Sequence, residues 1–232
     1  MDQSLQTQPG YAGTGALAGD HSRVLRNTYW LLALSLLPTV LGAWVGVSTG
    51  ITRTMSPGIS LIVFLAGSFG LIYAIERTKN SLVGVYLLLA FTFFMGLMLS
   101  QLLAMVLGSY KNGTSLVMTA FGGTAAVFFA MASLATVIKR DLSGMGKFLL
   151  VGALIVFVGF LVNFFLHSSA LMLTLLVVCL GVFSAFMLYD IKRVIDGGET
   201  NYVSATLAIY LDLFNVFQSL LMLLGIFGGD RD

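Results

Sequence analysis

The sequence predicts an all-α integral membrane protein whose chain crosses the bilayer seven times. Of its 232 residues, 58% are hydrophobic and only 9% are charged. Soluble domains carry about 25% charged residues, so this chain lacks the polar material that a soluble fold needs on its surface. A membrane-spanning helix needs roughly 20 mainly apolar residues, and seven stretches of the sequence meet that length. These stretches are about 26–48, 57–75, 81–108, 115–138, 147–166, 169–189 and 203–227.

Polar or turn-forming residues separate the apolar stretches and mark the connections between helices. The connection at His167 is very short, so the fifth and sixth spans are expected to form a tight helical hairpin. A row of small residues in the third span, Thr92, Gly96 and Ser100, predicts a face on which two helix backbones approach closely. Residues 1–20 lack an apolar core, so they predict a flexible tail rather than a signal peptide. The first span is then expected to act as an uncleaved export signal.

The distribution of Lys and Arg predicts the orientation in the membrane. One side of the predicted topology carries nine of these residues and the other side carries three. Basic loops favour the cytoplasm, so the N-terminus is expected inside and the C-terminus outside. The domain organisation is then a cytoplasmic tail, 1–20, followed by one transmembrane domain, 21–232. The nine are Arg23, Arg26, Arg77, Lys79, Lys139, Arg140, Lys147, Lys192 and Arg193, and the three are Arg53, Lys111 and Arg231.

The sequence argues against several classes of function. A formal net charge of +2, with scattered basic residues, does not indicate a nucleic-acid partner. Cys179 is the single cysteine, which excludes an internal disulfide and a thiolate metal cluster. No HExxH, GxSxG or P-loop motif is present, and His21 and His167 fall at opposite ends of the topology. The chain is therefore expected to be no enzyme and to hold no cofactor, with the lipid bilayer as its surroundings.

Two aspartates in the segment "LYDIKRVIDGGETNYVSATLAIYLDLFNVF", residues 188–217, are the leading functional candidates. Asp190 ends the predicted sixth span, and Asp212 lies about ten residues into the seventh, or roughly 15 Å at the rise of an α-helix. The two spans are antiparallel neighbours joined by a short loop, so the carboxyl groups are expected to approach each other. A carboxylate inside a membrane is costly and marks a candidate functional site.

The last span carries a small or polar face that contains the second aspartate. This face belongs inside the bundle or along a water-filled path, and its members are Ala205, Ala208, Asp212, Asn215 and Ser219. Two carboxyl groups at close range cannot both ionise cheaply, so Asp190 and Asp212 are expected to share a proton that pins their helices together. When both are ionised, they would repel each other and offer oxygen ligands to a hard cation such as Ca²⁺. The pattern predicts a pH-sensitive latch at the mouth of a cation path.

Other interpretations of the same residues stay open at this point. Asp190 is alternatively an interfacial residue paired with Lys192 or Arg193, and Asp212 a packing carboxylate paired with Asn, Gln or Arg. An intramembrane aspartyl protease is a further alternative, but the sequence lacks a second signature such as GxGD. The candidate gate partners of the two aspartates are Glu76 and Arg77, at the end of the second span, and Asn215.

The segments "GGETNYVSATLAIYLDLFNVFQSLLMLLG" and "FGGTAAVFFAMASLATVIKRDLS" resemble the Bax inhibitor-1 family, also called the transmembrane Bax-inhibitor-motif family. The resemblance runs from about residue 21 to the C-terminus and implies a seven-helix bundle with a central last helix. It also implies a pH-dependent calcium leak gated by a di-aspartate pair, for which Asp190 and Asp212 are the matching positions. A basic lock residue near the end of the second helix is implied as well. Here that segment reads "YAIERTKN", so the equivalent residue is Glu76 or Arg77.

The opening "RVLRNTYWLLALSL" and the "GGETNY" loop are most similar to the bacterial branch of the family that includes modulators of the FtsH protease. This resemblance implies a bacterial inner-membrane protein and a second candidate function, as a regulatory binding partner of FtsH. For a modulator, the tail from Met1 to Asp20 would be the handle that an ATP-driven membrane protease grips.

Overall fold

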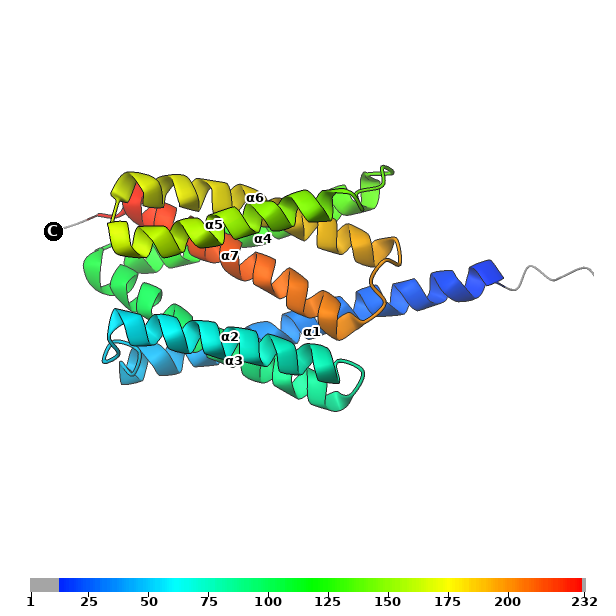
Figure 1. Cartoon of the computed structure of the whole chain (residues 1–232), viewed down its shortest axis with the longest axis horizontal. Helices are drawn as coiled ribbons and strands as arrows, with labels where there is room; N and C mark the ends of the chain where they lie inside the picture. The colour runs from blue at the N-terminus through cyan, green and yellow to red at the C-terminus, as the bar shows by residue number, and fades with distance from the viewer. Residues whose placement is uncertain (1–12, 231–232) are drawn as a thin grey trace, which may run out of the picture.

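The computed structural model describes the backbone of residues 13–230 and the side chains of residues 22–230. Within these residues the chain forms seven α-helices and no strand (Figure 1). All seven are long and apolar enough to cross a membrane, as the sequence predicted. The helices are α1 (Gly13–Thr49), α2 (Pro57–Thr78), α3 (Leu82–Ser109), α4 (Gly113–Val137), α5 (Met145–Leu166), α6 (Ser169–Ile195) and α7 (Tyr202–Gly228).

The prediction that Asp190 ends the sixth span was wrong, because α6 continues to Ile195. Lys192 and Arg193 resemble loop residues, but Ile191 and Val194, which flank them in the sequence, are buried in the core. Packing of these two apolar side chains extends the helix past the charged pair. The helix ends at Ile195, and Gly197, two residues further on, adopts a φ of +76° that favours glycine.

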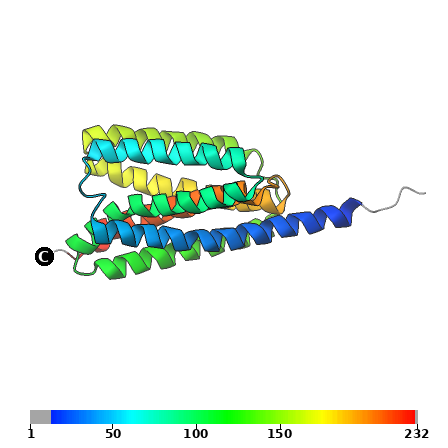
Figure 2. The ribbon, with the colours of Figure 1, turned by 90° about the horizontal axis from the view of Figure 1, so that it is seen from below.

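The first helix also begins earlier than predicted. Helix α1 starts at Gly13, inside the segment 1–20 that the sequence assigns to a tail. Extending a helix that has already formed adds one hydrogen bond per residue fixed, so a nucleated span grows outward readily. Figure 2 shows the N-terminal part of α1 continuing past the ends of the other helices. Residues 1–12 of the predicted tail lie outside the described residues.

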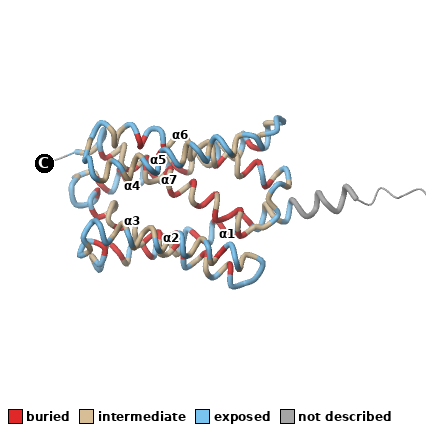
Figure 3. The backbone as a smooth tube through the Cα atoms, viewed as in Figure 1, coloured by how far each residue is buried: buried red, intermediate tan, exposed pale blue. Residues whose placement is uncertain are grey.

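Helix α7 occupies the centre of the bundle, between two groups of three helices. In one group α1 and α2 pack on α3, and in the other α4 and α5 pack on α6. Helix α7 contacts members of both groups and runs obliquely between them in Figure 1. Figure 3 shows buried residues along most of its length, among them Ile209, Val216 and Leu221. The central last helix expected from the family resemblance is therefore confirmed.

The outer surface of the bundle is apolar. Trp30, Phe148 and Phe165 point outward with 73%, 80% and 76% of their surface exposed. Contiguous apolar surface on this scale is unsuited to water and suits contact with lipid tails. The short connection between α5 and α6 is also as predicted, because Leu166 ends one helix and Ser169 begins the next.

Helices α1 and α3 cross at glycines, which lets their backbones touch. A Cβ atom added to Gly42 on α1 would overlap the carbonyl oxygen of Phe93 on α3. A Cβ added to Gly96 on α3 would overlap the carbonyl oxygen of Thr39 on α1. Neither position has room for a side chain, so the row of small residues in the third span does form a close helix contact.

Tyr210 ties the central helix to the first group of helices. Its hydroxyl lies 2.9 Å from Oγ1 of Thr39 on α1. The Tyr210 hydroxyl also donates to the carbonyl of Thr92 on α3 at 3.5 Å, and the Thr39 hydroxyl donates to the carbonyl of Ser35 at 2.9 Å. The tyrosine is only 1% exposed, and Phe91 packs edge-on against its ring.

We expect Tyr210→Phe to lower the free energy of unfolding by about 1 kcal/mol, the scale of one buried interhelical hydrogen bond. The substitution keeps the ring and removes only the hydroxyl, so no large cavity forms. Thermal unfolding in detergent measures the change. Tyr86→Phe is the matched control, because that side chain is 68% exposed on the outer surface. Equal stability of the two variants would contradict the assigned contribution.

Candidate functional site

Asp190 on α6 and Asp212 on α7 meet inside the bundle. The two side chains lie within hydrogen-bonding reach of each other, and a hydrogen bond between two carboxyl groups forms only when one of them carries a proton. Asp212 is only 3% exposed, and its Oδ2 has no hydrogen-bond partner among the described residues. Because α6 extends to Ile195, Asp190 lies more than one turn inside its helix and reaches the depth of Asp212.

The basic residues next to Asp190 on α6 have other partners. Nζ of Lys192 lies 2.7 Å from Oδ1 of Asp196, one turn further along the helix. Nη2 of Arg193 lies 3.3 Å from Oε2 of Glu199, in the loop before α7. Neither forms an ion pair with Asp190 in the described part of the chain. The structure therefore does not support the alternative interpretation, in which Asp190 pairs with Lys192 or Arg193.

A cavity of about 350 Å³ lies beside Asp190, at the end of the bundle where α2 ends and α7 begins. Asp190 forms part of its wall, whereas Asp212 lies behind that wall. A small hydrated ion or a water molecule in the cavity therefore meets the aspartate pair from the Asp190 side. The charged residues of the lining are Glu76, Lys79, Asp190, Arg193 and Glu199.

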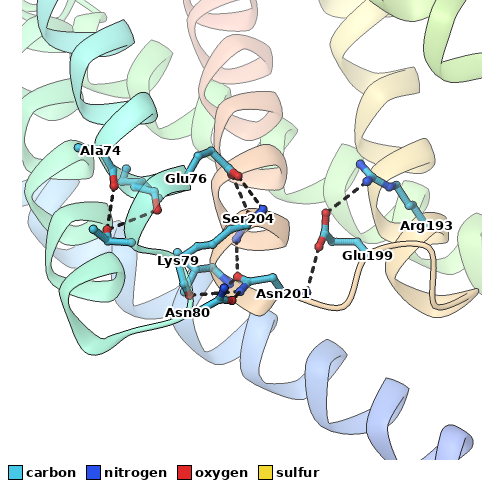
Figure 4. A network of polar contacts seen from close by, with 11 residues as sticks. Ala74, Glu76, Lys79, Asn80, Arg193, Glu199, Asn201 and Ser204 are labelled. Carbon is cyan, nitrogen blue, oxygen red and sulfur yellow. Dashed lines mark hydrogen bonds and ion pairs between the residues drawn. The ribbon is translucent and has the colours of Figure 1, made fainter.

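Polar contacts along this cavity connect the end of α2 to the start of α7 (Figure 4). The Ser204 hydroxyl donates to Oε1 of Glu76 at 2.8 Å, and Nζ of Lys79 lies 2.8 Å from Oε2 of the same carboxylate. The hydrogen bond to Glu76 raises the pKa of Lys79. Nδ2 of Asn201 donates to the carbonyl of Lys79 at 3.2 Å and to Oδ1 of Asn80 at 2.8 Å. The start of the central helix is thus fixed to the loop between α2 and α3.

The other predicted gate partners use their polar groups elsewhere. Arg77 is exposed; its Nε donates to the Tyr73 hydroxyl at 3.1 Å, and its guanidinium stacks over the Tyr73 ring. Nδ2 of Asn215 donates to the carbonyl of Leu211 in its own helix at 2.8 Å. Of the three predicted partners, Glu76 is the one that lines the cavity next to Asp190.

Two residues that form these polar contacts were not singled out by the sequence, and of the two only Ser204 belongs to the cavity wall. Asn201 and Ser204 were not among the predicted site residues. An Asn directly before an apolar helix is a recognised N-cap signal and could have marked Asn201. The contact between Ser204 and Glu76 joins residues 128 positions apart, and no local pattern indicates it.

No group of three or more His, Cys, Asp or Glu side chains is placed to hold a metal ion among the described residues. Asp190 and Asp212 remain the two predicted ligands for Ca²⁺. Because Ca²⁺ takes six to eight oxygen ligands, two carboxylates alone suit a passing ion better than a resident one.

The fold and the site define a multi-pass membrane protein of seven helices in which carboxyl groups of two helices face each other. A family described as inhibitor of apoptosis-promoting Bax1 matches residues 21–229. The chain is 36% identical over 203 residues to a protein of Escherichia coli K12 named modulator of FtsH protease YccA, covering 88% of this chain and 90% of that protein. The chain therefore belongs to the Bax inhibitor-1 family.

Two further relatives support its place in the membrane. YccA of Escherichia coli O6:H1, with the same identity and coverage, is named an inner membrane protein. A Vibrio cholerae protein named as a membrane protein is 36% identical over 205 residues, which cover 88% of this chain and 90% of the relative. Together with the seven apolar helices, these names identify the chain as a multi-pass inner-membrane protein.

Proposed function

We propose that this protein is a pH-sensitive cation leak, in which Asp190 and Asp212 are the proton sensor and the gate. The proposal rests on the close approach of two carboxyl groups, one on α6 and one on α7, which can share a hydrogen bond. That bond exists only while one of the carboxyl groups is protonated, so the shared proton holds α6 against α7. When the proton leaves, two negative charges stand at contact distance and favour separation of the helices.

The charges around the cavity favour a cation as the transported species. Glu76 from α2 is paired with Lys79, and Glu199 from the loop before α7 is paired with Arg193 of α6. Each pair is neutral as a whole, so Asp190 and Asp212 determine the net charge around the cavity. Loss of the shared proton raises the negative charge of the pair from one to two and increases the local concentration of cations. Ca²⁺ is the proposed ion because it prefers carboxylate oxygens.

We propose that the cavity faces the cytoplasm. The loops and helix ends on this side of the predicted topology carry nine of the twelve Lys and Arg residues of the chain, and such basic segments favour the cytoplasmic side. With an odd number of spans, the N-terminus is then cytoplasmic and the C-terminus periplasmic.

Ca²⁺ flux into liposomes that contain the purified protein tests the leak. We expect slow flux at about pH 6 and several-fold faster flux at about pH 8, because the proposed shared proton is released as the pH rises. Empty liposomes at each pH are the control for passive permeation. A flux that does not exceed that of empty liposomes, or that does not change with pH, would contradict the proposal.

A second candidate function is regulatory binding to the FtsH protease, which the name of the Escherichia coli K12 relative favours. The proposed handle is the tail from Met1 to Asp20, of which residues 13–20 belong to α1 and residues 1–12 lie outside the described residues. A short N-terminal segment that continues past the bundle is accessible to a protease without any unfolding of the membrane domain.

We expect deletion of residues 2–20 to abolish co-purification of FtsH from membranes and to leave Ca²⁺ flux unchanged. Asp190→Asn is the matched control, since it should alter flux and leave co-purification intact. Failure of the full-length chain to retain FtsH would contradict this second function, and retention by the shortened chain would contradict the role of the tail.

A further inference from the structure

The side chain of Asn201, at the edge of the cavity, forms hydrogen bonds both to α7 and to the loop between α2 and α3. Asn201 stands immediately before α7, and its Oδ1 accepts hydrogen bonds from the backbone N–H groups of Val203 and Ser204 at 2.9 and 3.1 Å. These contacts cap the helix. The other half of the same side chain, Nδ2, donates to the loop between α2 and α3. One amide therefore starts the central helix and ties it to a neighbour.

A second contact one turn into the helix reinforces this tie. The Ser204 hydroxyl donates to Glu76 on α2, and both residues belong to the cavity wall. Ala208 lies on the same wall one turn further along α7, followed by Leu211, the residue before Asp212. Movement of this part of α7 away from α2 would therefore widen the cavity and shift Asp212 relative to Asp190.

The opposite end of α7 is held by another asparagine. Nδ2 of Asn112, in the loop between α3 and α4, donates to the carbonyl of Gly228 at 2.7 Å. Oδ1 of Asn112 accepts from the backbone N–H of Asp230 at 3.0 Å. The central helix is thus fastened at both ends to the two loops that flank α3, and the fastening at Asn201 is the one beside the cavity.

We propose that Asn201, Ser204 and Glu76 form a clasp that holds the cavity end of α7 against α2 in the closed state. The clasp residues are positioning residues for the gate, and this role rests on the proposed leak function. Opening then requires two events, loss of the shared proton and release of the clasp. A weakened clasp lowers the free energy of opening at every pH, so a clasp variant opens under conditions that keep the native protein closed.

Two substitutions separate the clasp from the stability of the helix. Asn201→Asp keeps the side-chain shape and the oxygen that caps α7, since Asp is as good an N-cap as Asn, but it removes the N–H donor to Lys79 and Asn80. Ser204→Ala removes the donor to Glu76 and introduces a better helix former. Asn112→Asp is the matched control, because it makes the same chemical change at the far end of α7.

The direct readout is the rate at which a maleimide modifies a cysteine placed at Ala208, in purified protein at about pH 6, where the shared proton favours the closed state. The native Cys179 is replaced by Ala in every sample. We expect Asn201→Asp and Ser204→Ala to raise the rate roughly fivefold to tenfold, the scale of one lost hydrogen bond. Asn112→Asp should leave the rate unchanged, and the same variants are then assayed for Ca²⁺ flux.

An unchanged rate in both clasp variants, or an equal rise in Asn112→Asp, would overturn the clasp. A faster rate together with faster flux at about pH 6 supports the clasp and the leak. A faster rate with no Ca²⁺ flux in any sample supports the clasp and contradicts the leak, so failure of the two proposals can be told apart. The melting temperature of each variant shows that the bundle is intact.

Discussion

Asp212→Asn is expected to abolish the pH dependence of Ca²⁺ flux between about pH 6 and 8. The asparagine amide donates a hydrogen bond to Asp190 whether or not Asp190 is ionised, so the contact between α6 and α7 no longer requires a proton. In this variant, the negative charge of Asp190 also has no second carboxylate beside it to repel it. We expect flux to stay at the closed level, roughly tenfold or more below that of the native protein at about pH 8.

The sign of this effect follows from which state binds the proton. In the closed bundle the shared proton is part of the contact between the helices, whereas the open state exposes two separate carboxylates to water. Protonation therefore stabilises the closed state, and opening is favoured as pH rises. Asp190→Asn should give the same flat profile, because its amide donates to Asp212.

Asp196→Asn is the matched control for both variants. This carboxylate lies one to two turns beyond Asp190 and is paired with Lys192 at the edge of the bundle. Its removal changes the net charge by the same amount and should leave the pH profile of flux unchanged. A native profile in Asp212→Asn, or a flat profile in Asp196→Asn, would contradict the assignment of the sensor to Asp190 and Asp212.

Gly96→Ala is expected to destabilise the bundle by about 3 kcal/mol, although it adds only one methyl group. The added Cβ would overlap the carbonyl oxygen of Thr39 and lie 3.0 Å from the amide nitrogen of Ala43, both of them backbone atoms of α1. Only a shift of the whole of α1 relieves that overlap. Since Thr39 of α1 is hydrogen-bonded to Tyr210 of α7, the shift reaches the central helix.

Gly122→Ala provides the contrast, because a Cβ added there meets no atom within 4 Å. Replacement of Gly by Ala in a helix normally stabilises it by up to about 1 kcal/mol, so this variant should be neutral or more stable. The melting temperature and the monodisperse fraction in detergent compare the two proteins. Similar behaviour of the two variants would show that α1 and α3 do not pack as described.

The number of helices and most of their ends were predictable because an apolar run of membrane-spanning length is a strong and local signal. The end of α6 was not, because Lys192 and Arg193 look like the start of a loop. Burial of Ile191 and Val194 against other helices extends α6 beyond these two residues, and that burial depends on the packed bundle. The same extension of α6 carries Asp190 to the depth of Asp212.

The meeting of Asp190 and Asp212 was also predictable, since two antiparallel helices joined by a short loop must be neighbours. The residues that surround the pair were not predictable. Whether Glu76 or Arg77 faces the cavity depends on the rotation of α2 relative to α7, and the sequence of α2 is apolar on most sides. Glu76 faces Ser204 and Arg77 turns outward to Tyr73, so the position next to the cavity holds a carboxylate instead of the expected basic lock.

The central claim is that Asp190 and Asp212 share one proton, and pH-difference infrared spectroscopy of the purified protein in lipid tests it most directly. The account predicts a protonated-carboxyl band that disappears with the same pH midpoint as the rise in Ca²⁺ flux. The band should be altered or lost in Asp190→Asn and in Asp212→Asn, and retained in Asp196→Asn. A band that is unaffected by both substitutions, or that does not change as flux rises, would contradict the shared proton.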